Sequence, residues 1–473
     1  MDLDWRICSR ARLSRDARFD GRFYVAVLTT GIYCRPICRA RTAKESNVRY
    51  FSTAAAAAEA GFRPCLRCRP ECSPGTPAWL GTPSTVSRAL RLIGESGLDD
   101  GGVEMLAERL GIGSRHLRRL FLKHIGATPS AVAQTQRLHF AKKLIDETRL
   151  PMNQIALASG FGCVRRFNAA IRATYHRTPT QIRRLSRSPG EAEENQYLFR
   201  LGFRPPYAWG AMLAFLAARA TPGVEVVASG CYRRSISIGG RDGWFEVSLS
   251  PGGQTLAVRI EFGDPQLLFA IVERIRAIFD LSADPAEIAR CLRSDPLLGE
   301  RFVPGLRVPG CWDGFELSVR ELLGHSAGKV VKALGKPCSL AEGLTHFFPT
   351  REVLAQADLR AIGVPHDRAE AAQALARAFS AGQLSFSAGA EPQSVVSALC
   401  RIGVPASTAQ WVAMRALGEP DVFPTGDAGL LRSAGVRNPA DLERRSQSWR
   451  PWRAYAAVCL RSTETAGAQR RTG

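Results

Sequence analysis

Long apolar segments are absent from this sequence. No part of the 473-residue chain contains a run of about 18 apolar residues, and the amino-terminal stretch MDLDWRICSR has no apolar centre like that of a secretory signal. These absences argue against a membrane-spanning helix and against export. We therefore expect a soluble cytoplasmic protein with no membrane partner.

Acidic residues are scarce relative to basic ones. The chain has 43 Asp and Glu against 64 Lys and Arg, which gives a formal net charge of +21. A surplus of this size favours a polyanionic partner, nucleic acid first, over an acidic metabolite. The alternative is a solvated basic surface without a specific partner, because arginine is spread along the whole chain.

The cysteine pattern does not suggest a disulfide framework. The 13 cysteines are an odd number, and most of them stand singly. Four form a CxxxC and a CxxC pair in TTGIYCRPICRA and PCLRCRP, which favours a metal site in a reducing compartment. Cys34, Cys38, Cys65 and Cys68 would satisfy one tetrahedral Zn(II) ion. Taken alone, this spacing favours structural zinc over a site in which one cysteine reacts, since four thiolates leave no open position for water.

The length predicts several domains in a multidomain α+β protein. Proline, glycine and polar clusters such as CSPGTP and SRSPGEAEENQ mark the expected boundaries. We expect a small zinc-binding domain, an all-α domain, a linker, an α+β subdomain with an antiparallel sheet, a helical domain and a disordered tail. Their expected ranges are 1–78, 79–187, 188–196, 197–269, 270–465 and 466–473.

Two helix-turn-helix patterns are expected within residues 79–187. In the first, apolar residues spaced three and four apart from Val103 lead to the turn GIGS, where Ser114 is a candidate N-cap. In the second, the turn GFG precedes a helix containing Phe167. Farther along, 232–238, 244–249 and 255–262 alternate apolar and polar residues, which predicts an antiparallel meander.

The sequence from Phe23 to Pro70 resembles the amino-terminal zinc domain of Ada-type regulators of the alkylation response. The resemblance rests on FYVAVLTTGIYCRPICRARTAKESNVRYF followed by AGFRPCLRCRP. It implies that Cys34 is both a zinc ligand and the acceptor of a methyl group from a methylated DNA phosphate, since zinc would keep its sulfur a thiolate. Methylation removes one negative charge, which would let nearby arginines tighten DNA binding. These arginines are Arg35, Arg39, Arg41, Arg63, Arg67 and Arg69.

One further cysteine lies close to this motif. Cys72, four residues beyond Cys68, is either a competing ligand or a free surface thiol, and the resemblance favours the free thiol.

Two segments resemble the halves of an AraC-type DNA-binding domain. They are VEMLAERLGIGSRHLRRLFLKHIGATP and IALASGFGCVRRFNAAIRATYHRTPTQIR, in which Cys163 takes the place of a common serine cap. The resemblance implies that the second helix of each half enters a major groove, where arginine suits bidentate contact with guanine or contact with phosphate. The side chains expected at the grooves are Ser114, Arg115, His116, Arg118, Arg119, Arg165, Arg166 and Asn168.

The carboxyl-terminal half resembles the 3-methyladenine DNA glycosylase II (AlkA-like) branch of the helix-hairpin-helix glycosylases. The resemblance rests on LGFRPPYAWGAMLAFLAARATPGVE, LRVPGCWDGFELSVRELLG, LTHFFPT and DVFPTGDAGLL. It implies that Asp427 is the catalytic carboxylate, which stabilises the cationic sugar as an alkylated base leaves. The base would be flipped out of the stack. Without the resemblance, an Asp before Ala-Gly-Leu is more often a helix cap.

The hairpin of this half departs from the family pattern. In LCRIGVPASTAQW, Arg401 takes the place of a turn glycine, while Gly403 and Trp411 are expected to contact DNA. Arg461 stands where related enzymes carry a pocket tryptophan, which removes aromatic surface for stacking.

Together these features predict a sensor of DNA alkylation damage that regulates transcription, fused to an enzyme that excises alkylated bases. The expected partners are alkylated and promoter double-stranded DNA and RNA polymerase, and the expected state is a monomer in the bacterial cytoplasm, associated with the nucleoid. No PCHR motif is present, so repair of O6-methylguanine is not predicted. The alternative is a methylation-switched transcription factor with an inactive glycosylase-like half.

Overall fold

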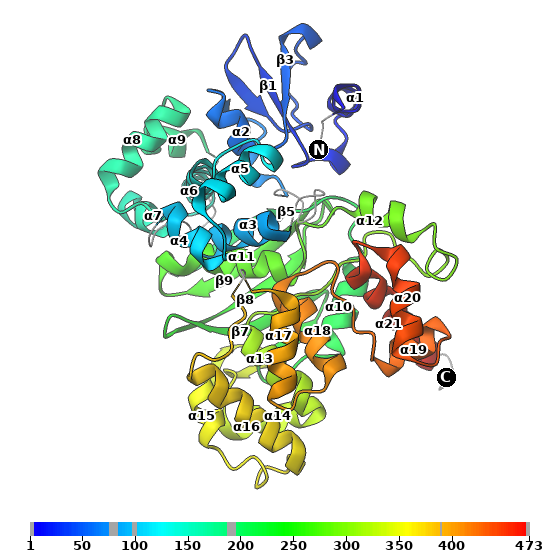
Figure 1. The fold of residues 1–473 in the computed structure, drawn as a ribbon. Coiled ribbons are helices and arrows are strands. Elements are labelled where there is room, and N and C mark those ends of the chain that lie inside the picture. The colour runs from blue at the N-terminus through cyan, green and yellow to red at the C-terminus, as the bar shows by residue number, and fades with distance from the viewer. Residues whose placement is uncertain (1–3, 75–83, 97–101, 187–194, 388–389, 470–473) are drawn as a thin grey trace. The chain divides into compact units, whose positions relative to one another are not determined.

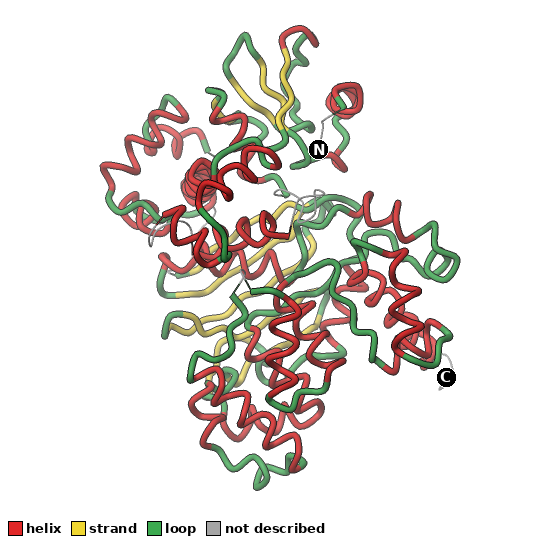
Figure 2. Tube along the Cα trace, in the orientation of Figure 1, coloured by secondary structure: helices red, strands yellow, loops and turns green. Residues whose placement is uncertain are grey.

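The computed structural model describes residues 4–74, 84–96, 102–186, 195–387 and 390–469 (Figures 1 and 2). The chain forms two compact units. The first comprises residues 1–205, 250–273 and 281–283, and the second comprises 206–249, 274–280 and 284–473. Among the described residues, no helix is long and apolar enough to cross a membrane.

The first unit begins with a four-stranded sheet in the order β3-β1-β2-β4. β1 pairs antiparallel with β2 and β3, and β2 pairs in parallel with β4. The alanine run of α2 starts at Thr53, whose hydroxyl accepts a hydrogen bond from the backbone N–H of Ala56. Tyr24, Tyr33 and three small alanines make a modest core. The elements are α1 Trp5–Ser14, η1 Ala17–Phe19, β1 Tyr24–Val27, β2 Ile32–Cys34, η2 Glu45–Asn47, β3 Val48–Phe51, α2 Ala54–Glu59, β4 Arg63–Pro64 and η3 Pro70–Cys72.

The next region of this unit is helical and contains the two predicted helix-turn-helix pairs, α4–α5 and α7–α8. The long helix α6 joins them and is buried over much of its length. Its elements are α3 Ser84–Ser96, α4 Gly102–Arg109, α5 Ser114–His124, α6 Pro129–Glu147, α7 Met152–Ala158, α8 Val164–Tyr175 and α9 Pro179–Leu185.

The two recognition-type helices begin differently. The prediction that Ser114 caps α5 is wrong: Gly113 is the N-cap, and Ser114 is already the first helical residue. Gly113 brings no side-chain acceptor, so α5 starts without a side-chain cap. Cys163 does occupy the N-cap of α8, and its sulfur accepts a hydrogen bond from the backbone N–H of Arg166 at 3.5 Å.

The predicted strands are present as β7, β8 and β9, and they form antiparallel pairs. In the first unit, β5 (Gln196–Gly202) pairs with β9 (Thr255–Phe262). In the chain β9 is followed by η4 (Pro265–Leu267) and by α11 (Leu268–Ile278), whose residues 274–278 belong to the second unit. In the second unit, β7 (Cys231–Ile238) pairs with both β6 (Glu225–Ala228) and β8 (Arg241–Leu249). Most of the linker expected at 188–196 lies outside the described residues.

The rest of the second unit is mainly helical (Figure 2). Helices α13, α16, α17 and α18 supply most of its Leu-, Val- and Ala-rich core. Its remaining elements are α10 Trp209–Ala217, α12 Pro285–Leu292, α13 Gly314–Leu323, η5 Gly324–Ser326, α14 Ala327–Leu334, β10 Pro337–Ala341, β11 Leu344–His346, α15 Arg351–Gln356, α16 His366–Ser380, α17 Pro392–Arg401, α18 Ala406–Leu417, α19 Ala428–Ala434, α20 Pro439–Ser446, η6 Gln447–Trp449 and α21 Arg453–Gln469.

The predicted hairpin is formed by α17 and α18 (Figure 1). Arg401 is the last residue of α17 and is helical, so its position does not require glycine. Gly403 has φ +98°, the left-handed region that favours glycine, and its backbone N–H donates to Cys400 O at 3.0 Å. The hairpin therefore closes with Arg401 in place. Helix α21 runs to Gln469, so residues 466–469 of the expected tail are helical, and 470–473 lie outside the described residues.

Candidate functional sites

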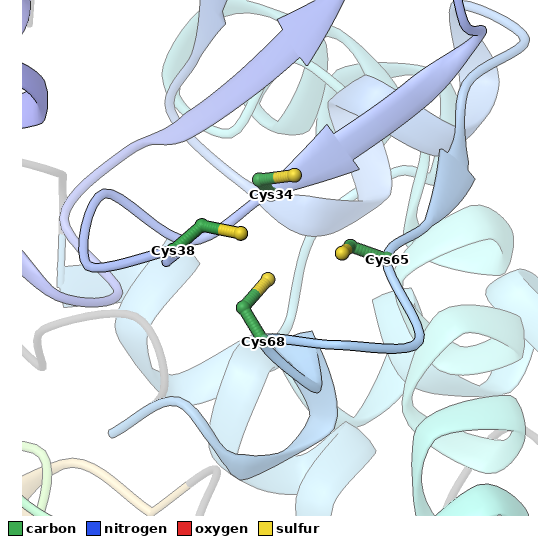
Figure 3. Close-up of side chains that lie close together, drawn as sticks. All are labelled: Cys34, Cys38, Cys65 and Cys68. Atoms are coloured by element: carbon green, nitrogen blue, oxygen red, sulfur yellow. The ribbon is translucent and has the colours of Figure 1, made fainter. Parts of the chain in front are cut away.

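Four cysteine sulfurs gather at one end of the small sheet. Cys34 ends β2, Cys38 lies in the loop that follows, and Cys65 and Cys68 follow β4. Figure 3 shows their sulfurs directed toward a common centre, and all four lie within 4.8 Å of one another. Four sulfurs bound about 2.3 Å from one tetrahedral ion lie about 3.8 Å apart, so small shifts would let them bind Zn(II). The donor set fits the expected ion.

Backbone pairing sets this geometry. The backbone N–H of Cys65 donates to Tyr33 O at 3.0 Å, which holds the start of the second cysteine pair beside the first. The N–H of Cys38 donates to Arg35 O at 3.1 Å and closes a turn between Cys34 and Cys38. In addition, the N–H of Arg35 points at the sulfur of Cys68 at 3.4 Å. A peptide dipole of this kind favours the thiolate form of a sulfur.

The sulfurs also influence each other's protonation. Contact with Cys34 lowers the pKa of Cys38 to about 7 and also lowers the pKa of Cys65, whereas contact with Cys38 raises the pKa of Cys34 and contact with Cys34 raises the pKa of Cys68. Cys72 is not a member of the cluster, and its thiol points toward a carboxylate oxygen of Glu147 at 4.0 Å. Burial raises the pKa of Cys72. Cys72 is therefore a half-buried thiol of η3 that faces helix α6. It is neither a fifth member of the cysteine cluster nor an exposed group.

The arginines around the cluster fall into two groups. The side chain of Arg35 is largely buried, forms an ion pair with Asp20 and donates to Cys68 O at 3.1 Å, so it braces the cysteine loop. Arg39, Arg41 and Arg67 are exposed, and Arg63 is half-buried. The exposed group is the one that presents charge to solvent near the cysteines.

Arg69 belongs to a buried charge network that sequence analysis missed. Its guanidinium forms ion pairs with Glu71 at 3.1 Å, with Asp146 at 3.0 Å and with Glu147 at 2.9 Å, the last two on helix α6. In the sequence Arg69 looks like one more DNA-facing arginine. The sequence KKLIDE contains its two partners on α6, Asp146 and Glu147. No local pattern indicates that this segment lies beside Arg69.

A second contact connects the cysteine region to α6. The hydroxyl of Tyr33, the residue before Cys34, lies 3.0 Å from Nε2 of His139. Burial raises the pKa of Tyr33 and lowers that of His139, which favours the neutral forms of both. The cluster is thus connected through its neighbours in the chain to the helix that joins the two helix-turn-helix pairs.

Most side chains predicted to contact DNA from α5 and α8 are exposed. Ser114 and Asn168 are half-buried, while Arg115, His116, Arg119, Arg165 and Arg166 are exposed. Arg118 is exposed and forms an ion pair with Glu104 at 2.8 Å. A surface ion pair of this type is worth little and does not prevent phosphate binding.

Asp427 lies in the second unit at the N-terminus of α19 and is 7% exposed. Its Oδ1 accepts a hydrogen bond from the backbone N–H of Leu430 at 2.9 Å, so it is the helix cap that its sequence context favours. Its Oδ2 accepts a hydrogen bond from the indole N–H of Trp411 at 2.8 Å. Trp411, predicted to contact DNA, is instead a buried residue of α18 that orients this carboxylate, at 5% exposure.

Arg461 completes this second site. Its Nη2 lies 3.0 Å from Oδ2 of Asp427, and its guanidinium carbon lies 4.9 Å from the centre of the Trp411 ring. The sequence places Arg461 at a pocket position but does not show that it reaches the carboxylate. The carboxylate of Asp427 is therefore contacted by residues of three helices: Trp411 of α18, Leu430 of α19 and Arg461 of α21.

Three family models match successive parts of the chain. They are the metal-binding domain of Ada over residues 7–71, a helix-turn-helix domain over 106–185 and the AlkA N-terminal domain over 198–313. The chain therefore fuses an Ada zinc domain, a helix-turn-helix region and an AlkA-like half, and the predicted fold class is confirmed.

Curated relatives agree over most of the chain. A protein of Mycobacterium tuberculosis named "Probable bifunctional transcriptional activator/DNA repair enzyme AlkA" is 40% identical over 98% of this chain and 97% of its own length. DNA-3-methyladenine glycosylase 2 of Escherichia coli K12 is 33% identical, covering 56% of this chain and 98% of its own. The bifunctional activator/DNA repair enzyme Ada of E. coli K12 is 42% identical over 26% of this chain and 34% of its own. The chain belongs to the family of bifunctional transcriptional activators and DNA repair enzymes of the AlkA type.

Proposed function

We propose that this protein repairs methylated DNA phosphates through Cys34, binds DNA more tightly as a result to activate transcription, and excises alkylated bases through Asp427. The observation that carries the first part is the cluster of four sulfurs within 4.8 Å, built into a region that matches the metal-binding domain of Ada. One Zn(II) ion held by Cys34, Cys38, Cys65 and Cys68 is the proposed cofactor, and it keeps the sulfurs in the thiolate form.

The methyl transfer needs few other groups. The Cys34 sulfur attacks the methyl carbon of a DNA methylphosphotriester, an S–C bond forms, the C–O bond breaks, and the electron pair leaves with the phosphodiester oxygen. No general base is required because the sulfur is already a thiolate. The product is a thioether, so each molecule reacts once.

Loss of one negative charge supplies the switch. Before the reaction, the anionic sulfurs oppose the DNA backbone, and the exposed Arg39, Arg41 and Arg67 attract it. After methylation the arginines act against a smaller negative charge. The exposed arginines of α5 and α8 supply the remaining proposed contacts to promoter DNA.

Asp427 is the proposed catalytic residue for base excision. A buried carboxylate held by two hydrogen bonds is positioned in advance to stabilise positive charge that develops on the sugar as the C1′–N bond breaks. The base departs with the electron pair of the C1′–N bond, and water then adds to C1′ and releases one proton to solvent. Gly403, with its exposed backbone turn, is the proposed DNA contact of the α17–α18 hairpin.

The proposal is tested with zinc-loaded protein and two substrates. A duplex carrying one methylphosphotriester should add the mass of one methyl group to the wild type and to Cys72→Ala, the thiol outside the cluster, but not to Cys34→Ser. A duplex carrying 3-methyladenine should lose the base with the wild type and not with Asp427→Asn. Methyl transfer to Cys34→Ser would contradict the first role, and base release by Asp427→Asn would contradict the second.

A second candidate function follows from the Arg461–Asp427 ion pair. A cation 3.0 Å from the carboxylate opposes its use as the anion beside a cationic sugar. In that case the protein is a methylation-switched transcription factor whose second unit only binds DNA. Methyl transfer with no release of any damaged base would support this version.

A further inference from the structure

The carboxylate of Asp427 has a charged partner on its exposed side. The Asp427 side chain is 8% exposed, whereas that of Arg461 is 33% exposed. Oδ1 is occupied by Leu430 N–H and Oδ2 by Trp411 N–H, and the guanidinium, which lies over the indole ring, adds a third contact. Because Arg461 touches the carboxylate and is the more exposed of the two side chains, we expect a base or sugar at Asp427 to lie close to Arg461 as well.

We propose that Arg461 is a specificity-determining residue that lowers the preference of this site for positively charged, N-alkylated bases and raises its relative activity on neutral damaged bases. The site still takes N-alkylated bases, and neutral purine lesions, for which hypoxanthine is a suitable probe, are the class added by Arg461. This inference rests on the proposed excision function, which it deepens by naming the charge of the favoured base.

The charge of the base before and after cleavage carries the argument. An N-alkylated purine such as 7-methylguanine enters as a cation and leaves neutral, taking the electron pair of the C1′–N bond. A neutral purine leaves as an anion, which then takes a proton from water. Arg461 opposes entry of the cation and stabilises the departing anion, so it acts in opposite directions on the two classes.

The position of the charge supports an effect on a nearby base. A guanidinium is permanently charged, so the electrostatic effect of Arg461 does not depend on which of its N–H donors are engaged. The guanidinium also lies on an aromatic face, which keeps it near Asp427. Because its side chain is one-third exposed, water reduces but does not remove its electrostatic effect.

A merely structural role predicts a different result. If Arg461 only fixed the rotamer of Asp427, its removal would change the release of every base by a similar factor. A charge effect changes the ratio between cationic and neutral bases. The ratio is therefore the quantity to measure.

The experiment compares single-turnover release of 7-methylguanine and hypoxanthine from otherwise identical duplexes. We expect Arg461→Gln to raise the ratio of 7-methylguanine to hypoxanthine release by at least about tenfold. Arg461→Lys, which keeps the charge, should stay within about threefold of the wild type. Arg445→Gln removes an exposed arginine of α20 in the same unit and should leave the ratio unchanged. Equal changes for both bases in Arg461→Gln would overturn the proposal.

A binding measurement keeps the proposal testable without turnover. A duplex with a pyrrolidine abasic nucleotide places a protonated amine near the C1′ position, and a tetrahydrofuran duplex places no charge there. Arg461→Gln should increase the preference for pyrrolidine by about tenfold over the wild type. If the wild type releases neither base but this preference still shifts, excision fails and the charge effect of Arg461 stands. If Asp427→Asn abolishes release but neither ratio responds to Arg461→Gln, excision stands and the role of Arg461 is wrong.

Discussion

The two candidate reactive sites place arginine differently relative to their anions. At the cysteine cluster, two nearby arginines are paired with carboxylates: Arg35 with Asp20, and Arg69 with three acids. At the second site Arg461 contacts the carboxylate of Asp427 directly. The same residue type is therefore neutralised by acids beside the cysteines, whereas at the second site it contacts the candidate catalytic anion itself. Arginine content alone does not describe the electrostatics of either site.

The two sites also differ in what holds them together, and metal removal should expose this with the largest effect. The sheet around the cysteines packs a small core rich in alanine, whereas the α13–α18 core consists of many leucines and valines. We expect chelation of zinc to unfold the cysteine region, because structural zinc sites contribute about 10 kcal/mol to folding. Limited proteolysis should then cleave within residues 4–74 and leave the second unit intact.

One variant serves as the control for this experiment. Cys72→Ala should retain one zinc per chain and the same protease pattern as the wild type, because Cys72 lies outside the cluster. Zinc-free protein that resists protease as well as the loaded protein would show that the small core suffices without metal.

Removal of Arg69 should have the next largest effect, and it tests how the cysteine region is anchored. Arg69→Met leaves Glu71, Asp146 and Glu147 with less compensation, and the side chains of all three are nearly buried. We expect the free energy of unfolding to fall by about 2 kcal/mol, since breaking a buried ion pair is costly and Arg69 is partly exposed.

The matched control is Arg67→Met, two residues earlier and exposed. It should change the free energy of unfolding by less than about 0.5 kcal/mol. Chemical denaturation of both variants at matched zinc content gives the comparison. Lys142 also forms ion pairs with Glu71 and Asp146, and Lys143 forms one with Glu147. An equally small loss in Arg69→Met would show that these two lysines neutralise the acids without Arg69.

Short-range patterns in the sequence predicted much of the fold and the cysteine cluster. The CxxxC and CxxC spacing predicted which four cysteines lie together, and the periodicity around Val103 and Phe167 identified the helix-turn-helix pairs, because cysteine pairs and helix faces are local properties. The predicted N-cap of α5 is wrong by one residue, because Gly113 and Ser114 are both acceptable N-cap residues and the local sequence does not distinguish them. In the structure Gly113 is the N-cap. The ranges of the predicted domains remain predictions.

Contacts between distant segments could not be predicted in this way. Arg461 and Asp427 are 34 positions apart on different helices, and Arg69 reaches α6 across 78 positions to Glu147. Nothing in the local sequence of either arginine distinguishes an internal ion pair from a DNA contact. Trp411 was likewise expected on the DNA surface, because an aromatic near a hairpin gives no sign of whether its N–H will meet an internal carboxylate.

The smallest predicted effect separates the two roles of Asp427, helix cap and reactive anion. Asparagine keeps a side-chain oxygen for Leu430 N–H but removes the charge, whereas alanine removes both. We therefore expect Asp427→Ala to lower the free energy of unfolding by about 1 kcal/mol more than Asp427→Asn does, while both lose base release. Denaturation and single-turnover release are measured on the same preparations. If Asp427→Asn releases the base at the wild-type rate and Asp427→Ala does not, Asp427 acts only as a helix cap. The second site would then have no reactive side chain at position 427, unlike the cysteine cluster, where Cys34 is the proposed nucleophile.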